Sequence, residues 1–330
     1  MTREPRPKRY PPPEFPPRRP ALFARTPPAI FPPILGFLGL ALAARLALAR
    51  LGLDTGPGEL VAGLAVALWL FGAVAYLGKV IRRPGVVVED LRVLPGRSGL
   101  AALTMGGMIA ATLVSTHAAG VGAVVLLAAL VGHAVVAVLL VRLLASLPPE
   151  ARAVNPTLHL SFVGFIVAAP AALAQGWSGL AEFLFWITLP VAVAIWGLSL
   201  RQFAHSVPPA PLRPLLAIHL APAALLGTTA ALLAKPELAV MLAGLGLVYA
   251  VVLAAYGRWL IESGISAMWG AFTFPVAALA SALMVTGGTW LWPGVVLTAV
   301  ALGVIPAILW WVLKRWPGGK LAAVTNAAEA

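Results

Sequence analysis

The sequence predicts an all-α integral membrane protein, and three properties of the chain support this fold class. Hydrophobic residues make up 61% of the chain and charged residues only 10%, whereas a soluble domain carries about 25% charged residues. Apolar runs of about 20 residues, the length that crosses a bilayer as a helix, follow one another along most of the chain. Lys and Arg gather at the ends of these runs, as expected for membrane-spanning segments.

Polar residues, Gly and Pro divide the chain into ten predicted transmembrane helices. The spans are 29–50, 59–81, 97–115, 119–146, 156–175, 179–201, 213–234, 237–261, 266–287 and 292–314. The third and fourth are separated only by the short stretch "STHAAG". We therefore predict one transmembrane domain over 29–314, between a Pro-rich basic tail at 1–28 that we expect to be disordered and a second tail at 315–330.

The basic residues predict the orientation of these spans. If both termini lie in the cytoplasm, most of the 23 Lys and Arg residues are cytoplasmic, and Arg50 and Lys235 remain outside. In a soluble protein the net charge of +12 would suggest nucleic acid, but orientation in a lipid bilayer explains it better. We predict a multi-pass protein of the plasma membrane, or of the inner membrane of a bacterium, with no nucleic-acid partner.

A proline-centred pattern recurs in three odd-numbered spans. The segments "FVGFIVAAPAAL", "LLAIHLAPAALL" and "WGAFTFPVAAL" align on Pro170, Pro222 and Pro275, which are 52 and 53 residues apart. Each unit is an odd span, a short outer turn and an even span, so the ten spans form five helical hairpins. Internal repeats of this kind are common in transport proteins, where the pathway lies at the repeat interface.

The matched prolines suggest that the odd helices surround a pathway. Proline inside a helix removes one backbone hydrogen bond, which would free the carbonyls of Ile166, Ile218 and Ala271. Freed backbone groups are tolerated at membrane depth where they face protein or a water-filled cavity. The alternative is that the prolines only kink the helices for packing.

Two phenylalanines before Pro275 fall on different faces of their span. Phe272 shares a face with bulky residues such as Trp269 and Val276, whereas the face of Phe274 is otherwise small. The small residues on that face include Gly270, Ala271 and Ala278, and the matching repeat positions are Ala169 and Ala221. A lone ring among small residues is either a plug in a narrow pore or a filler of empty space.

Three motifs carry a family resemblance. "NPTLHLSFVG" (155–164), "LRPLLAIHLAPA" (212–223) and "WGAFTFP" (269–275) resemble the tellurite-resistance/C4-dicarboxylate transporter family, which includes the slow-type anion channels of plant guard cells. The resemblance implies a quasi-five-fold ring of hairpins around a central pore, assembly as a homotrimer, and occlusion of the pore by Phe274. A His-Pro element that family members usually carry before the third span is absent here, where the chain reads "RRPGVVVEDLRVLPGRSG".

Few polar residues lie inside the spans. No Asp or Glu lies at the middle of a span, which favours passive conduction over proton coupling through carboxylates. His159, Ser161 and His219 lie on odd spans and are candidates for a polar pathway, and His133 on an even span is expected to have a packing role. No metal-ligand spacing or catalytic motif is present, so we expect no metal, no cofactor and no enzymatic activity.

Anion selectivity needs a source of positive charge. Arginines stand at the predicted cytoplasmic mouths of the spans, where they could form a basic vestibule that concentrates anions, although each also fits an orientation signal. The vestibule candidates are Arg97, Arg152, Arg213 and Arg258.

Three functional hypotheses follow. The first is a channel for small anions, gated by displacement of Phe274 from an apolar pore. The second is a secondary carrier for C4-dicarboxylates such as malate or for oxyanions such as tellurite and sulfite, with proton coupling through His159 or His219. The third is a membrane scaffold that acts through the basic N-terminal tail.

Overall fold

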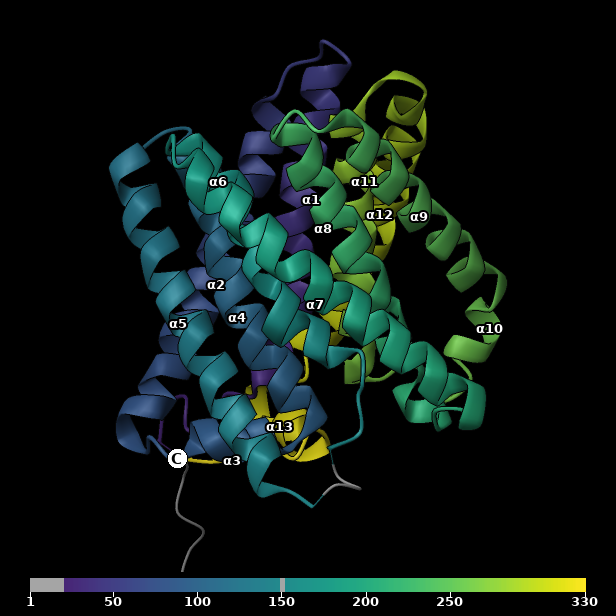
Figure 1. Cartoon of the computed structure of the whole chain (residues 1–330). Coiled ribbons are helices and arrows are strands. Elements are labelled where there is room, and N and C mark those ends of the chain that lie inside the picture. The colour runs from purple at the N-terminus through teal and green to yellow at the C-terminus, as the bar shows by residue number, and fades with distance from the viewer. Residues whose placement is uncertain (1–20, 149–151) are drawn as a thin grey trace, which may run out of the picture.

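The chain is an all-α membrane protein, as the sequence predicts. The computed structural model describes residues 21–148 and 152–330, and this part of the chain contains helices and no strand. Figure 1 shows the long helices running side by side. The short helices α3 (Val86–Arg92) and α13 (Lys320–Val324) and the C-terminus lie at one end, which we call the terminal end. Most of the predicted N-terminal tail lies outside the described residues.

Within the described residues, nine helices are long and apolar enough to cross a membrane. They are α1 (Phe31–Arg50), α2 (Gly56–Arg82), α4 (Leu94–Ser115), α5 (Ala119–Ser146), α7 (Ser178–His205), η5 (Ala210–His219) continued by α8 (Leu220–Leu232), α9 (Pro236–Ala255), η6 (Ala267–Phe272) continued by α11 (Thr273–Thr286), and α12 (Leu291–Leu313).

The fifth predicted span, 156–175, differs from the other nine. It forms a shorter apolar helix, His159–Ala174, with three successive backbone geometries. A π-helical turn η3 (His159–Val163) is followed by a 3₁₀ segment η4 (Gly164–Ala168) and by the α-helix α6 (Ala169–Ala174). The ten predicted spans thus correspond to nine long helices and this one shorter apolar helix in the described part of the chain.

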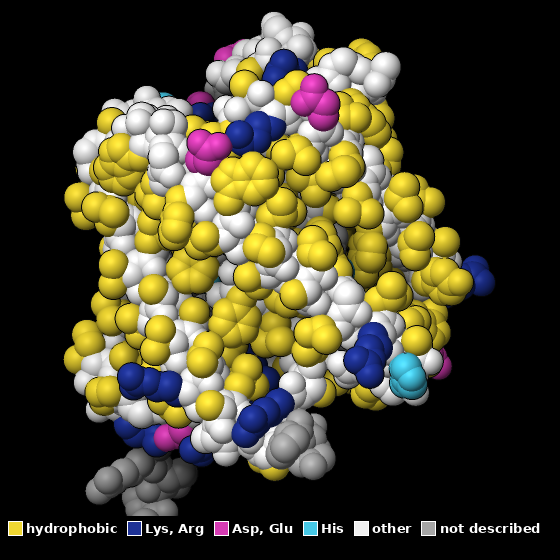
Figure 2. Space-filling view, viewed as in Figure 1, with side chains coloured by type: hydrophobic (Ala, Val, Ile, Leu, Met, Phe, Trp, Pro, Cys, Tyr) yellow, Lys and Arg dark blue, Asp and Glu magenta, His cyan; other side chains and the backbone are white. Residues whose placement is uncertain are grey.

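Burial separates the long helices into two sets. In α1, α4, η5–α8 and η6–α11, 67–72% of the most apolar stretch is buried inside the protein, against 22–33% in α2, α5, α7, α9 and α12. A helix buried on most sides packs against protein, whereas a helix buried on one side leaves the rest for lipid. The odd-numbered spans are thus inner helices and the even-numbered spans are outer helices. Figure 2 shows the apolar surface that results between the two charged ends.

The inner helices contact one another in a closed order. α1 packs against α4 and α11, and α11 packs against α8. α4 contacts η4 and α6, and these two segments contact α8 in turn. Every inner element therefore has two inner neighbours, which is the packing that a space enclosed by helices requires.

The matched prolines mark a change of helix type rather than a kink. Pro170, Pro222 and Pro275 each lie within the first three residues of an α-helix, after a 3₁₀ or π segment. Proline is tolerated in a first turn because its missing N–H would have no partner in the helix. The α-helical half of each of these three spans begins one or two residues before its proline, and a 3₁₀ helix precedes it.

Two carbonyls in these segments, those of Ile166 and His219, have identified hydrogen-bond donors. The expected free carbonyl of Ile166 accepts the backbone N–H of Ala169, so that expectation is wrong there. Outer helices supply further donors, because the indole N–H of Trp196 on α7 donates to the carbonyl of His219 at 3.0 Å. In the same way Trp69 on α2 donates to the carbonyl of Leu103 on α4 at 2.9 Å. The outer helices therefore satisfy polar backbone groups of the inner helices.

α1 and α11 approach each other closely through a glycine. A Cβ atom on Gly36 of α1 would lie 2.2 Å from the Oγ1 atom of Thr273, the first residue of α11. Thr273 is fully buried, and its hydroxyl donates to the carbonyl of Gly270 at 2.7 Å. Any side chain at Gly36 would therefore force these two inner helices apart.

We predict that Gly36→Ala lowers the free energy of unfolding by about 1–3 kcal/mol, the usual cost of overpacking a buried contact. Gly63→Ala on α2 is the matched control, because nothing lies within 4 Å of a Cβ atom there. Thermal unfolding of the protein in detergent measures both variants. Equal unfolding temperatures for the two variants would contradict the close α1–α11 contact.

Candidate functional site

All five inner elements line one cavity near the terminal end. Its volume is about 30 Å³, enough for one or two water molecules. The lining residues come from the first turns of the inner spans and are almost all apolar. They are Ala29, Pro32, Leu35, Pro95, Ser98, Ala102, Leu160, Leu215, Ile218, Ala267, Met268, Gly270, Ala271, Phe274 and Pro275. We call this space the inner cavity.

Phe274 is the large aromatic side chain of the inner cavity. It is 4% exposed, and its ring lies over Gly39 of α1, where a Cβ atom would be 3.1 Å from the ring. Phe272 has a different environment, since it is half-buried and packs edge-on against Trp269 with ring centroids 6.0 Å apart. The two phenylalanines therefore have the separate positions that helical phase suggests.

The small residues predicted to line a pathway occupy different places. Gly270, Ala271 and Pro275 line the inner cavity beside Phe274. Ala221 and Pro222 line a second, smaller cavity of about 10 Å³ between α4, η3–η4 and α8. Ala169 and Ala278 are buried and Pro170 is half-buried, but all three lie outside the linings of these two cavities.

Leu160 lines both cavities and so lies between them. It is 6% exposed and belongs to the π-helical turn η3. Helical periodicity did not single it out, because the residues of η3 do not repeat every 3.6 positions. Phe274 and Leu160 are therefore two buried apolar groups that line the inner cavity.

His159 and His219 are in direct contact. The Nε2 atom of His159 lies 2.9 Å from the Nδ1 atom of His219, and both side chains are buried. His159 also lines the second cavity. The hydroxyl of Ser161 is buried and has no hydrogen-bond partner in the described part of the chain. Tertiary structure thus joins two of the three predicted polar-pathway residues across the third and fourth hairpins.

His133 has the packing role that the sequence predicts. It is fully buried on α5, and its Nδ1 atom lies 2.7 Å from the hydroxyl of Thr104 on α4. Its ring also packs edge-on against Phe165. Among the described residues, no group of three His, Asp or Glu side chains is arranged to hold a metal ion.

The four vestibule arginines have unequal environments. Arg97 is 7% exposed, and its Nε atom donates to the carbonyl of Leu91 at 2.7 Å. Arg213 pairs with Glu262 and stacks on Trp259 with 4.4 Å between the guanidinium carbon and the ring centroid. Two others are exposed at the surface: Arg152, which donates to the carbonyls of Ala145 and Leu147 at the C-terminal end of α5, and Arg258. The structure therefore does not arrange the four as one continuous ring of exposed charge.

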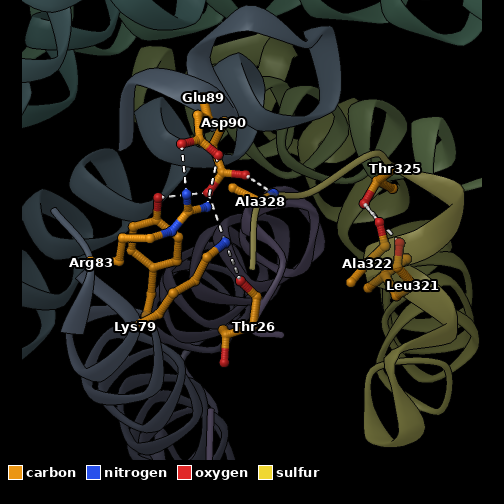
Figure 3. A network of polar contacts seen from close by, with 10 residues as sticks. Thr26, Lys79, Arg83, Glu89, Asp90, Leu321, Ala322, Thr325 and Ala328 are labelled. Atoms are coloured by element: carbon orange, nitrogen blue, oxygen red, sulfur yellow. Dashed lines mark hydrogen bonds and ion pairs between the residues drawn. The ribbon is translucent and has the colours of Figure 1, made fainter. Parts of the chain in front are cut away.

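A buried ion pair at the terminal end was not predicted. The Nζ atom of Lys79 on α2 lies 2.9 Å from a carboxylate oxygen of Asp90 on α3, and both side chains are completely buried (Figure 3). The hydroxyl of Tyr76 donates to the same oxygen at 2.9 Å. Charges near the end of a span usually face solvent, so position alone did not distinguish this pair. The sequence signal for this pair was the presence of opposite charges, Lys79 and Asp90, on either side of the turn at Pro84.

Comparison with protein families identifies the class of the protein. The chain matches the family described as voltage-dependent anion channel over residues 25–314 and therefore belongs to it. The matched region covers the inner and outer helices and both cavities. No curated protein matches the chain. Family membership makes this multi-pass membrane protein an anion channel or transporter, in agreement with the resemblance carried by the three sequence motifs.

We predict that Trp196→Phe lowers the free energy of unfolding by about 0.5–1.5 kcal/mol, because the part-buried hydrogen bond from the indole to the carbonyl of His219 would be lost. Trp292→Phe is the control, since Trp292 lies on an outer helix and is 63% exposed. The midpoint of thermal unfolding in detergent measures the difference. A Trp196 variant as stable as the Trp292 variant would show that the indole bond is dispensable.

Proposed function

We propose that the protein is a channel for small anions whose pore runs between the five inner helices and is closed by Phe274. The observation that carries this proposal is the inner cavity, to which all five inner elements contribute and on which Phe274 borders. The closed order of inner-helix contacts also supports a ring around a pore.

An apolar constriction can close such a pore without a charged gate. Water and ions leave a narrow apolar passage because they lose hydration there without gaining polar partners. Phe274 and Leu160 are buried apolar groups that line the inner cavity, and the cavity is too small for a hydrated anion. Movement of the Phe274 ring away from Gly39 would remove the bulkiest of these groups.

Preference for anions is assigned to positive charge near the pore mouth. Arg97 is buried one residue from Ser98, which lines the inner cavity, and no carboxylate pairs with it among the described residues. A buried charge is screened less than an exposed one, so it raises the local potential more. Arg258 and Arg152 add exposed positive charge outside the lining of the inner cavity.

The orientation and assembly are part of the same proposal. The positive-inside pattern favours a cytoplasmic position for both termini and for the terminal end, in a protein of the plasma membrane. The family resemblance favours a homotrimer with one pore in each subunit. The outer helices would then face lipid over most of the surface and neighbouring subunits over the rest.

Phe274→Ala is expected to raise the anion conductance by about tenfold or more, which corresponds to removal of a barrier of about 1.4 kcal/mol. Recording chloride and nitrate currents from purified protein in planar bilayers measures this effect. The reason for the increase is that alanine leaves the inner cavity open where the ring now closes it.

Phe272→Ala is the matched control, because this ring packs against Trp269 and does not line the inner cavity. It is expected to leave the conductance within about twofold of wild type. If Phe272→Ala raised the current and Phe274→Ala did not, the assignment of the gate would be wrong.

A secondary carrier for dicarboxylates or oxyanions is the second candidate, favoured by one observation. His159 and His219 share a close contact next to the second cavity, and histidine can relay protons at physiological pH. A carrier of this kind would couple anion uptake to proton movement through the pair.

Uptake of malate, sulfite and tellurite into proteoliposomes with and without a pH gradient tests this candidate. A proton-coupled carrier would accumulate substrate only with the gradient and would lose this response in His219→Ala. His117→Ala is the control, because His117 is exposed and distant in sequence from the pair. Uptake that ignores the gradient and the His219 substitution would exclude proton coupling through these histidines.

A further inference from the structure

The C-terminal segment 320–330, which we call the C-terminal clasp, folds back onto the terminal end of the protein. Its helix α13 anchors it through Leu321, which is fully buried. The residues that follow reach two other segments of the chain, and Figure 3 shows the first of these contacts, between Ala328 and Asp90. The backbone N–H of Ala328 donates to a carboxylate oxygen of Asp90 at 2.8 Å, and the N–H of Ala330 donates to the carbonyl of Ala24 at 3.1 Å.

The clasp completes the buried ion pair. One oxygen of Asp90 accepts from Lys79 and Tyr76, and the other accepts from Ala328. Lys79 in turn donates to the carbonyl of Thr26 at 3.1 Å. A buried carboxylate is stable only when its oxygens are hydrogen-bonded, so withdrawal of the clasp would leave Asp90 with one oxygen unsatisfied. Docking of the clasp and burial of the pair therefore support each other.

The clasped segments lead directly to the inner cavity. Thr26 lies three residues before Ala29, and Asp90 lies five residues before Pro95, and both Ala29 and Pro95 line the cavity. The clasp also adds an ion pair here, between Arg25 and Glu329 at 2.8 Å. The clasp thus holds the segments that precede α1 and α4.

Tight backbone contacts make these segments move together. A Cβ atom on Gly96 would lie 1.9 Å from the carbonyl oxygen of Asp90, and one on Gly99 would lie 2.2 Å from the carbonyl oxygen of Pro28. Neither contact leaves room for sliding, because protein interiors are close-packed. A shift of Asp90 is therefore transmitted through α4 to Pro28 and so to the mouth of the inner cavity.

We propose that the C-terminal clasp is a restraint on opening: when docked, it holds the beginnings of α1 and α4 against the inner cavity, and its release lets the cavity widen. This inference rests on the proposed channel function, but it does not depend on which side chain forms the gate. The segment that docks on the terminal end is thus residues 320–330 of the same chain.

Ala328→Pro tests the restraint, because proline has no N–H to donate to Asp90. The variant is expected to raise the anion conductance by at least about fivefold, the lower range of coupling between distant sites. Ala328→Gly, which keeps the N–H, is the matched control and is expected to behave as wild type. A proline variant that folds, as judged by its elution and thermal unfolding, and conducts as wild type would overturn the proposal.

A reversible lock gives the opposite test, since the chain contains no cysteine. The hydrogen bond between Ala330 and Ala24 places these residues close enough for the pair Ala24→Cys/Ala330→Cys to form a disulfide. Oxidation should lower the conductance of the double variant, reduction should restore it, and neither single variant should respond. Failure of the disulfide to form in the membrane would show that the clasp is not docked, and an unresponsive oxidised pair would show that docking does not restrain opening.

Combination with Phe274→Ala separates the two proposals. Absence of anion current from every variant, Phe274→Ala included, would contradict the proposed channel function. It would also contradict the clasp proposal, which rests on that function. Current from Phe274→Ala with no effect of Ala328→Pro or of the disulfide would contradict only the clasp. If oxidation and reduction of the double cysteine variant changed its conductance while Phe274→Ala had no effect, the result would support the clasp as a restraint and reject Phe274 as the gate.

Discussion

The structure depends on one constraint, which is that every backbone polar group at membrane depth needs a hydrogen-bond partner. The inner spans do not all meet it with continuous α-helices, because four of them begin as 3₁₀ or π segments. Side chains from the outer helices add donors to inner-helix carbonyls, as Trp196 does for His219 and Trp69 does for Leu103. The outer helices thus donate hydrogen bonds to the backbone of the inner helices in addition to separating them from lipid.

The same constraint explains where the prolines lie. A proline in the middle of a regular inner helix would leave a carbonyl without a partner. Placed in the first turn of an α-helix, it costs no hydrogen bond, and the 3₁₀ segment before it completes its own bonds over three residues. Pro222 and Pro275 follow this pattern after ten and six residues of 3₁₀ helix, respectively. The inner helices can therefore bring small residues together around a space without exposing polar backbone.

Polar interactions concentrate at the terminal end, where chain segments that are distant in sequence meet. Lys79 and Asp90 are buried together with the carbonyl of Thr26 and the N–H of Ala328. Burial of an ion pair adds little net stability, since desolvation offsets most of the attraction. Its effect is to make one arrangement of these segments far better than the others. That arrangement sets the position of the helices that line the inner cavity.

Composition and periodicity alone determined the membrane class, the boundaries of nearly all the spans and the difference between Phe272 and Phe274, because hydrophobic length and helical phase are local properties. The three regularly spaced prolines likewise identified three of the inner helices, because the repeat is visible in the sequence itself. Tertiary structure alone decided that His159 touches His219, that Leu160 separates two cavities and that Arg213 is neutralised by Glu262. It also decided the burial of Lys79 and Asp90. These contacts join residues from different hairpins or helices. The local sequence of one segment does not indicate which residue of another segment it will contact.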